Sequence, residues 1–245
     1  MEIEVTGPKV AFVINGIPFS ETCIVSFLLL IVLSGVIIWL GRGLKVVPET
    51  KKQVVAEFFV TFFNNTVRDV GGEKMMRYAP YIACIFSYAL TGSLISMLGF
   101  RSMTADICVT GTWAALTFVL ITYNKIKANG FLGYLDSFTH PKLMTPMNIV
   151  SEFATPCSMA LRMFGNISGG MIITTIIYAA LSLASSAIYN LVGILPADAP
   201  NYFSIFSIGI PAVFSIYFDL FSGTVQSYLF IMLTLSYVSM AAETD

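Results

Sequence analysis

The chain has 245 residues, of which 56% are hydrophobic and only 11% are charged, and its mean hydropathy is +0.81. Soluble domains carry roughly 25% charged residues, so this composition excludes a water-soluble globular protein and indicates an integral membrane protein. The net charge of −1 provides no basic field for nucleic acid, and we expect no nucleic-acid partner.

Residues 1–12 are acidic and lack the basic region and the small-residue cleavage site of a signal peptide, so we expect the first apolar segment to remain in the protein. A membrane-spanning helix needs about 20 apolar residues. Such segments occupy residues 22–40 and 78–100, and a shorter one occupies residues 107–123. The sequence therefore predicts one multi-pass membrane domain over residues 1–245.

Residues 48–70 predict an amphipathic helix instead of a span. Pairs of Val and Phe recur in it every four residues, with charged and amide side chains between them. Pro48 can open such a helix, and Gly71 and Gly72 can end it. Because no soluble domain is left for it to cover, we predict that this helix lies in the membrane interface.

Two longer apolar segments follow, at residues 148–195 and 201–240. Each exceeds one upright crossing, which predicts two long and strongly tilted helices. The turn sequence from Pro196 to Pro200 predicts that they pair as an antiparallel hairpin, and Pro211 predicts a kink in the second helix. The predicted fold class is an all-α membrane protein with about five transmembrane helices and one interfacial helix.

The Lys and Arg residues outside the spans are distributed unevenly. Seven lie between the first two spans and three follow the third, against two elsewhere apart from Arg162. Because cytoplasmic loops are rich in Lys and Arg, we predict an external N-terminus and a cytoplasmic C-terminus.

Cysteine and histidine give no sign of a metal or cofactor site. The cysteines have no CxxC spacing, and each lies in or beside an apolar segment, which predicts buried and unreactive thiols: Cys23, Cys84, Cys108 and Cys157. His140 follows Thr139 in a polar stretch, and we expect it at the surface. We therefore expect no metal and no cofactor.

Arg162 is the cation deepest in the predicted hairpin. A guanidinium in hydrocarbon costs about 2.5–3.5 kcal/mol and cannot lose its proton there. The side chain either reaches back to the interface or supplies a fixed positive charge that attracts a passing carboxylate and repels a bare cation. On a straight helix Asn166 and Gly169 share its face, which favours the second interpretation.

Asp219 is the complementary charge. Residues at equal depth in an antiparallel hairpin have numbers with a constant sum, so one register places Arg162 opposite Gln226. Asp219 then lies about 10 Å from Arg162 in depth, which favours an ion relay with access from outside over an ion pair. Glu152, ten residues before Arg162, is either a solvated charge or part of an inner access path.

The residues from Pro156 to Asn166 read PCSMALRMFGN. This sequence resembles the signature of subunit a of the F-type ATP synthases, whose typical form is P-x-S-x-x-L-R-L-F-G-N. The segment GEKMMRYAP before the second span and the C-terminal segment QSYLFIMLTLSYVSM are similar to the same family, and Thr104-Ala-Asp106 matches it more loosely. The resemblance covers about residues 45–240.

The resemblance implies an ion-conducting stator and not an enzyme, since other subunits carry out the ATP chemistry. In this family two aqueous half-channels lie beside a rotating ring of c subunits, and H⁺ or Na⁺ rides on a ring carboxylate. Arg162 takes the place of the essential arginine that faces this carboxylate. The implied partners are the c ring, the peripheral-stalk b subunits and the lipid bilayer. The absence of an Arg- and Ser-rich transit segment favours a bacterial plasma membrane.

The resemblance also assigns the other polar residues of the hairpin. Asn166 and Gln226 match family positions near the arginine, and Asp219 falls where the family commonly has an ionisable group in the outer half-channel. Met171 stands where Glu or His is frequent, which leaves Asp219 as the ionisable residue of that path.

Two other functions compete with the stator. A secondary transporter would use Arg162 to bind an anionic solute, but the inverted repeats typical of such proteins are not visible in the sequence. A purely structural membrane anchor would leave Arg162 and Asp219 without a role.

Overall fold

The computed structural model describes residues 10–14, 17–45, 50–98, 100, 102–139, 145–192, 213–214 and 216–242. Within this part of the chain, five helices are long and apolar enough to cross a membrane. They contain α1 (Glu21–Gly41), α3 (Ala79–Leu94), α4 (Ile107–Thr139), α5 (Thr145–Val192) and α7 (Gly223–Ala242). The predicted helical membrane fold is confirmed.

A short β-hairpin precedes α1 and was not predicted. Strand β1 (Val10–Ile14) pairs antiparallel with β2 (Ile17–Ser20), and the second strand leads directly into α1. The β-branched and aromatic residues of both strands suit such pairing. The all-α description therefore holds for the membrane-crossing part and omits this hairpin.

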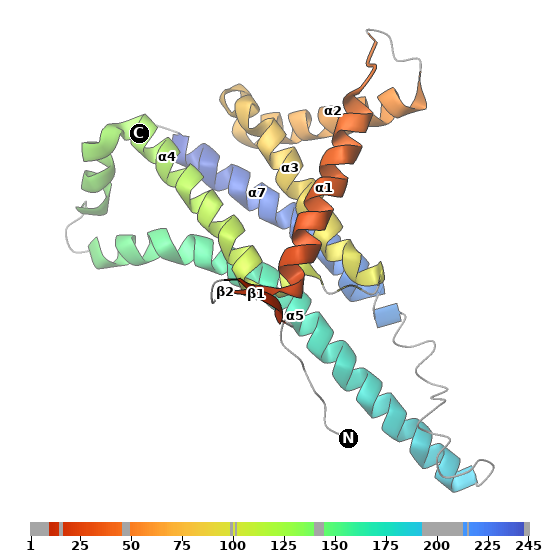
Figure 1. Cartoon of the computed structure of the whole chain (residues 1–245). Coiled ribbons are helices and arrows are strands. Elements are labelled where there is room, and N and C mark those ends of the chain that lie inside the picture. The colour runs from red at the N-terminus through yellow and green to blue at the C-terminus, as the bar shows by residue number, and fades with distance from the viewer. Residues whose placement is uncertain are drawn as a thin grey trace.

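Helix α2 (Lys51–Gly71) lies across the ends of α1 and α3 and is nearly perpendicular to α1 (Figure 1). The Thr50 hydroxyl caps its start by accepting a hydrogen bond from the backbone N–H of Gln53. Gly72 ends it with φ of 67°, a left-handed conformation that glycine adopts without strain. Its crosswise position is the one expected for a helix in the membrane interface.

Helix α7 forms the centre of the bundle, between α3 and α4 (Figure 1). Its fully buried side chains include Phe230, Ile231 and Leu235, and the Phe230 ring lies 6.1 Å from that of Trp113 on α4. Helix α1 is the opposite case, since only Thr22 is buried in it and Phe27 is 65% exposed. The apolar surface of α1 therefore faces lipid or another subunit.

The middle of the chain is more helical than predicted. The polar stretch after residue 123 continues α4 to Thr139, with a break at Gly130, where φ is 73°. The second span is divided: the 3₁₀ helix η1 (Glu73–Tyr78) precedes α3, and the 3₁₀ helix η2 (Ile95–Leu98) follows it. A third 3₁₀ turn, η3 (Met103–Ala105), leads to α4.

The hairpin helices differ from each other in regularity. Helix α5 is a continuous element of 48 residues with Pro156 inside it, and Figure 1 shows that it changes direction along its length, as a helix with an internal proline does. The second helix begins with a π-helical segment, η7 (Ile216–Ser222), before α7. The predicted turn at residues 196–200 and the predicted kink at Pro211 lie outside the described residues, as does His140.

The four cysteines correct one prediction. All of them are free thiols, but they are exposed on the surface of the chain and not buried. Apolar neighbours in the sequence indicated burial, and in a membrane protein such neighbours can equally face lipid.

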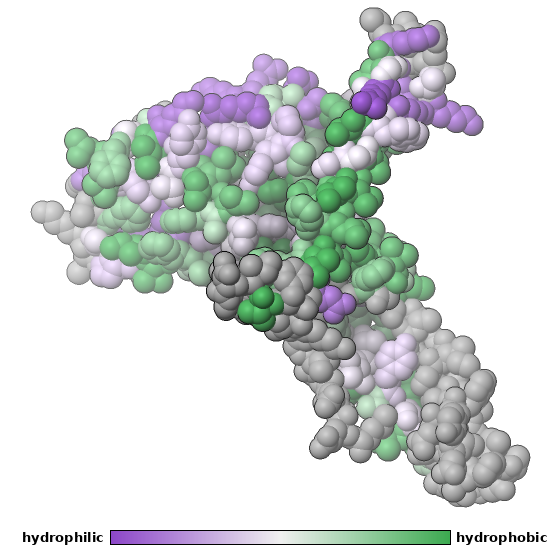
Figure 2. Space-filling view, in the orientation of Figure 1, coloured by the Kyte–Doolittle hydropathy of each residue, from purple (hydrophilic) through white to green (hydrophobic). Residues whose placement is uncertain are grey.

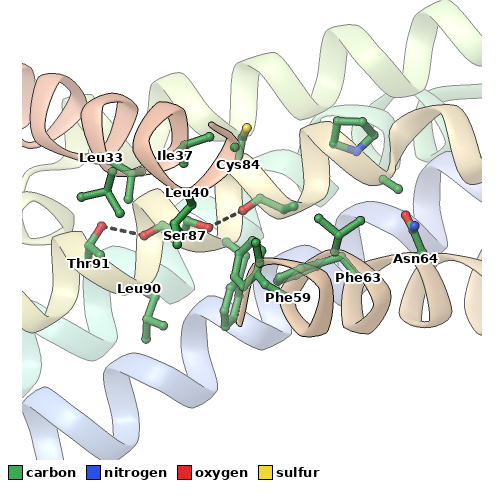
Figure 3. Close-up of a pocket in the computed structure, with 18 of the residues that line it drawn as sticks. Leu33, Ile37, Leu40, Phe59, Phe63, Asn64, Cys84, Ser87, Leu90 and Thr91 are labelled. Carbon is green, nitrogen blue, oxygen red and sulfur yellow. Dashed lines mark hydrogen bonds between the residues drawn. The ribbon is translucent and has the colours of Figure 1, made fainter. Parts of the chain in front are cut away.

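An apolar groove lies between α1, α2 and α3 (Figure 3). Its volume is about 530 Å³, and Leu33, Phe59 and Leu90 each contribute to one of its walls. The hydroxyls of Ser87 and Thr91 donate to backbone carbonyls of their own helix, at 2.7 and 2.6 Å. The described residues that line the groove include no Asp, Glu, Lys, Arg or His, so we do not place ion conduction in it.

Candidate functional site

The two hairpin helices meet at a pair of side-chain contacts. The Ser222 hydroxyl donates a hydrogen bond of 2.8 Å to Oδ1 of Asn166. One turn further along α5, a Cβ atom on Gly170 would lie 3.0 Å from the Phe218 ring. The residue numbers in both pairs have the same sum as those of Arg162 and Gln226. The structure thus has the register that the sequence predicted.

Arg162 lies on an open face of α5. Its side chain is exposed, and it makes no hydrogen bond or ion pair with any residue that the structure describes. A Cβ atom added to Gly165 or Gly169 would have no neighbour within 4 Å. The guanidinium is therefore flanked on one side by a helix surface that another helix can approach closely.

The other polar residues point into the chain. Gln226 is 6% exposed on α7, and Asn166 is half-buried through its bond to Ser222. The hydrogen bonds of the described residues include none between Arg162 and Gln226, although the two have equal depth in the hairpin. Depth follows from register, whereas the direction of each side chain is set by the rotation of its helix.

Asp219 occupies the middle of the π-helical segment η7 and is half-buried. The Ser96 side chain on η2 lies close enough to interact with it. A second serine of the same region, Ser93, has its hydroxyl 2.9 Å from the position of a Cβ on Gly223. The ion pairs among described residues do not include Asp219, so the alternative of an Arg162–Asp219 ion pair is wrong. Ser96 was not predicted from the sequence, where its place three residues after Ser93 was the available signal.

Glu152 is paired and largely buried. Its carboxylate lies 2.5 Å from the Lys125 ammonium and accepts a longer hydrogen bond, of 3.4 Å, from the Tyr134 hydroxyl. The Glu152 side chain is 12% exposed, so the interpretation as a solvated charge is wrong. The pair borders a cavity of about 230 Å³ between α4, α5 and α7, which Thr155, Pro156 and Tyr237 also line.

A second buried carboxylate lies at the start of α4. Asp106 accepts hydrogen bonds from the Thr22 hydroxyl at 2.7 Å, from the Cys108 amide at 3.0 Å and from the Ser20 hydroxyl at 3.4 Å. Burial alone would raise the pKa of Asp106, but these donors outweigh it and lower the pKa below the usual carboxyl value. Asp106 therefore fastens the start of α1 to the start of α4.

Comparison with known proteins gives a family for this arrangement. The family model described as ATP synthase A chain matches residues 23–239. The chain is 31% identical to the sodium-ion-specific ATP synthase subunit a of Propionigenium modestum, over 92% of this chain and 75% of that one. It is 26% identical to ATP synthase subunit a of Moorella thermoacetica, over 95% of both chains, and 29% identical to that of Oceanobacillus iheyensis, also over 95% of both.

The match covers α1 through α7, with the Arg162 face of α5 and the Asn166–Ser222 contact inside it. A multi-pass membrane protein with these helices and these relatives is a subunit of the membrane sector of ATP synthase. The chain belongs to the ATP synthase A chain family.

Proposed function

We propose that this chain is the ion-conducting stator beside the c ring, and that Arg162 is the residue that faces the ring carboxylate. The observation that carries the proposal is the open face of α5. A guanidinium without an ion-pair partner among the described residues lies there next to Gly165 and Gly169, whose missing side chains leave room for a second helix. A fixed positive charge on this face would attract a ring carboxylate and repel a bare cation between two half-channels.

The outer half-channel would pass Asp219. A half-buried carboxylate beside a serine side chain, at a π-helical turn, can exchange an ion with water and with the ring. Ser96, Ser93 and the Asn166–Ser222 pair would supply further polar groups on the way to Arg162. Met171 adds no ionisable group to this path.

The inner half-channel would start near the Lys125–Glu152 pair. The pair borders a cavity on the part of α5 that precedes Arg162, and Thr155 adds a hydroxyl to it. The distribution of Lys and Arg supports a cytoplasmic position for this end, with the N-terminus outside and the C-terminus in the cytoplasm of a bacterium.

Energy coupling explains why the arginine matters. One elementary charge that crosses 100 mV supplies about 2.3 kcal/mol, which is too little for one ATP, so rotation must sum several charges. A direct path between the two half-channels would release this energy as leakage. The ion is H⁺ or Na⁺, and the name of the relative from Propionigenium modestum supports testing Na⁺ first.

The test of Arg162 is Arg162→Ala in the assembled complex with the c ring and the peripheral-stalk b subunits. We expect normal assembly and loss of ATP-driven ion pumping. Thr175→Val, exposed on the same helix but on a different face from Arg162, is the matched control and should leave pumping intact. Coupled pumping in Arg162→Ala would disprove the assigned role. If the protein takes up a solute without ATP, and Arg162→Ala abolishes this uptake, the result would favour the secondary transporter.

The test of Asp219 is Asp219→Asn. We expect slower ion flux from the outer side with little change in assembly, because the amide keeps the size of the side chain and loses its charge. Flux measured over a range of external pH or Na⁺ concentration gives the result. An unchanged flux over that whole range would rule out the relay.

A further inference from the structure

A basic pocket lies at the end of the bundle where η1 begins and α7 ends. Its volume is about 380 Å³, and its walls come from η1, α4 and the last residue described in α7: Lys74, Met75, Arg77, Asn124, Lys127, Ala128 and Ala242. Figure 2 shows hydrophilic residues along the edge of the molecule on which these segments lie. The apolar part of α4 stops at Tyr123, immediately before this pocket.

The charges of the pocket have one sign. Among the described residues that line it, three are cations and none is a carboxylate. The nearest acid in the sequence, Glu73, lies 3.9 Å from Arg68 on α2. The neighbouring acid on α5, Glu152, is paired with Lys125. The described structure therefore concentrates positive charge here without a partner for Lys74 or Lys127.

Asn124 holds Arg77 in place. This asparagine is 2% exposed, and its Oδ1 accepts hydrogen bonds from Arg77 Nη2 at 3.2 Å and from the Tyr78 hydroxyl at 2.7 Å. Its Nδ2 donates to the Leu120 carbonyl at 2.8 Å, which fixes the orientation of the amide. The Arg77 guanidinium also lies 4.8 Å from the centre of the Tyr78 ring. A guanidinium held through one nitrogen keeps its other N–H groups for an anion.

The position of the pocket decides the class of anion. It lies where one membrane-crossing segment begins at Glu73 and another ends at Ala242, beside the polar part of α4 that follows Tyr123, and this is near the level of lipid headgroups. Basic pockets between transmembrane helices bind the headgroups of anionic lipids. We propose that this pocket binds the phosphate of an anionic phospholipid, with Arg77, Lys74 and Lys127 as its ligands. The bound lipid would fasten η1, α4 and α7 together.

Photocrosslinking in the assembled complex tests the proposal. The complex is placed in phosphatidylcholine nanodiscs that contain a trace of phosphatidylglycerol with a photoreactive group beside the phosphate. We expect adducts on the peptides around Lys74 and Lys127. Each cation contributes about fivefold to binding at an anionic surface, so Lys127→Gln should reduce the adducts about fivefold. Arg42→Gln, at the exposed end of α1, is the matched control and should not reduce them.

Three results would overturn the proposal. Equal adducts from a phosphatidylcholine probe of the same design would show that the negative charge of the lipid plays no role. Complete protection by millimolar inorganic phosphate would identify a site for a soluble anion. Two acidic residues, Glu243 and Asp245, follow Ala242 in the sequence. If adducts occur only in the variant with Glu243→Gln and Asp245→Asn, the chain itself occupies the pocket. Loss of adducts in Lys127→Gln but not in Arg42→Gln supports it.

Discussion

The Ser222 hydroxyl donates a hydrogen bond of 2.8 Å to Oδ1 of Asn166, and this bond joins η7 to α5 one turn from Arg162. It fixes the register of the hairpin together with the contact between Gly170 and Phe218. The bond also ties the π-helical segment that carries Asp219 to the helix that carries Arg162. The distance between the two proposed ion-handling charges is therefore set by one polar contact and one packing contact.

Removal of the Ser222 hydroxyl should loosen this junction. Ser222→Ala leaves the amide oxygen of Asn166 without its donor, which costs about 0.5–1.5 kcal/mol for a neutral hydrogen bond. The thermal inactivation temperature of the complex in lipid should fall. Thr224→Val is the control. The Thr224 hydroxyl donates to the Leu220 carbonyl, four residues earlier in the chain, and this bond does not connect to α5. An equal fall in both variants would contradict a special role for the junction.

The two classes of glycine on α5 should respond differently to the same change. Gly165→Leu fills a position with no neighbour within 4 Å, so the subunit should still accumulate in the membrane, while ATP-driven pumping is lost because the ring can no longer approach. Gly170→Leu drives a side chain into Phe218 at 3.0 Å. Such overpacking costs about 1–3 kcal/mol, and the amount of subunit in the membrane should fall.

Immunoblots of isolated membranes and pumping assays on the same preparation separate these outcomes. Normal pumping by Gly165→Leu would show that no other helix approaches that face.

The Asp106 anchor should depend on pH in a defined direction. Its pKa is lowered in the folded protein, so its hydrogen bonds stabilise the fold above the unfolded carboxyl pKa of about 3.9. That stabilisation is lost as the pH falls through the lower, folded pKa. Thr22→Val should cost about 1.5–3 kcal/mol at neutral pH, the range for a hydrogen bond to a charged group.

Thermal unfolding in lipid, at neutral pH and at a pH below the folded pKa, gives this comparison. The difference between Thr22→Val and the unchanged protein should shrink in acid. Ser20→Ala removes the longer bond of 3.4 Å to Asp106 and the 2.6 Å contact between the Ser20 and Thr22 hydroxyls, but it keeps the Thr22 bond to Asp106, so it should have a smaller effect at neutral pH. A constant difference at both pH values would mean that Thr22 stabilises α1 by some other contact.

The Lys125–Glu152 pair should show strong coupling between its two side chains. The pair is intermediate between surface and buried ion pairs, because Lys125 is 32% and Glu152 12% exposed. Glu152→Met leaves the ammonium unpaired and should destabilise the subunit by about 1–3 kcal/mol. The double variant with Lys125→Met should recover part of this loss. Unfolding measurements on both single variants and the double variant give the coupling energy, and strictly additive losses would argue against a direct interaction.

Much of the fold could be predicted from the sequence. Apolar runs of sufficient length located the membrane-crossing segments, and the four-residue repeat of Val and Phe located α2. The prediction ended the third span early because polarity rises after Tyr123. Helix α4 nevertheless continues past Gly130, since helix formation in lipid headgroups and water does not require apolar residues. The periodicity of apolar residues did not predict the β-hairpin or the π-helical segment.

The sequence by itself determined that the chain is a membrane protein and that its last two helices form a hairpin. It also determined that Arg162 and Gln226 have equal depth in this hairpin. These properties follow from composition, length and counting along a helix, which are local. Only the tertiary structure decided that Arg162 lies on an open face, that Glu152 is paired with Lys125 and that Ser222 bonds to Asn166. Each of these depends on how one helix is rotated against another. That rotation is set by packing between residues far apart in the chain.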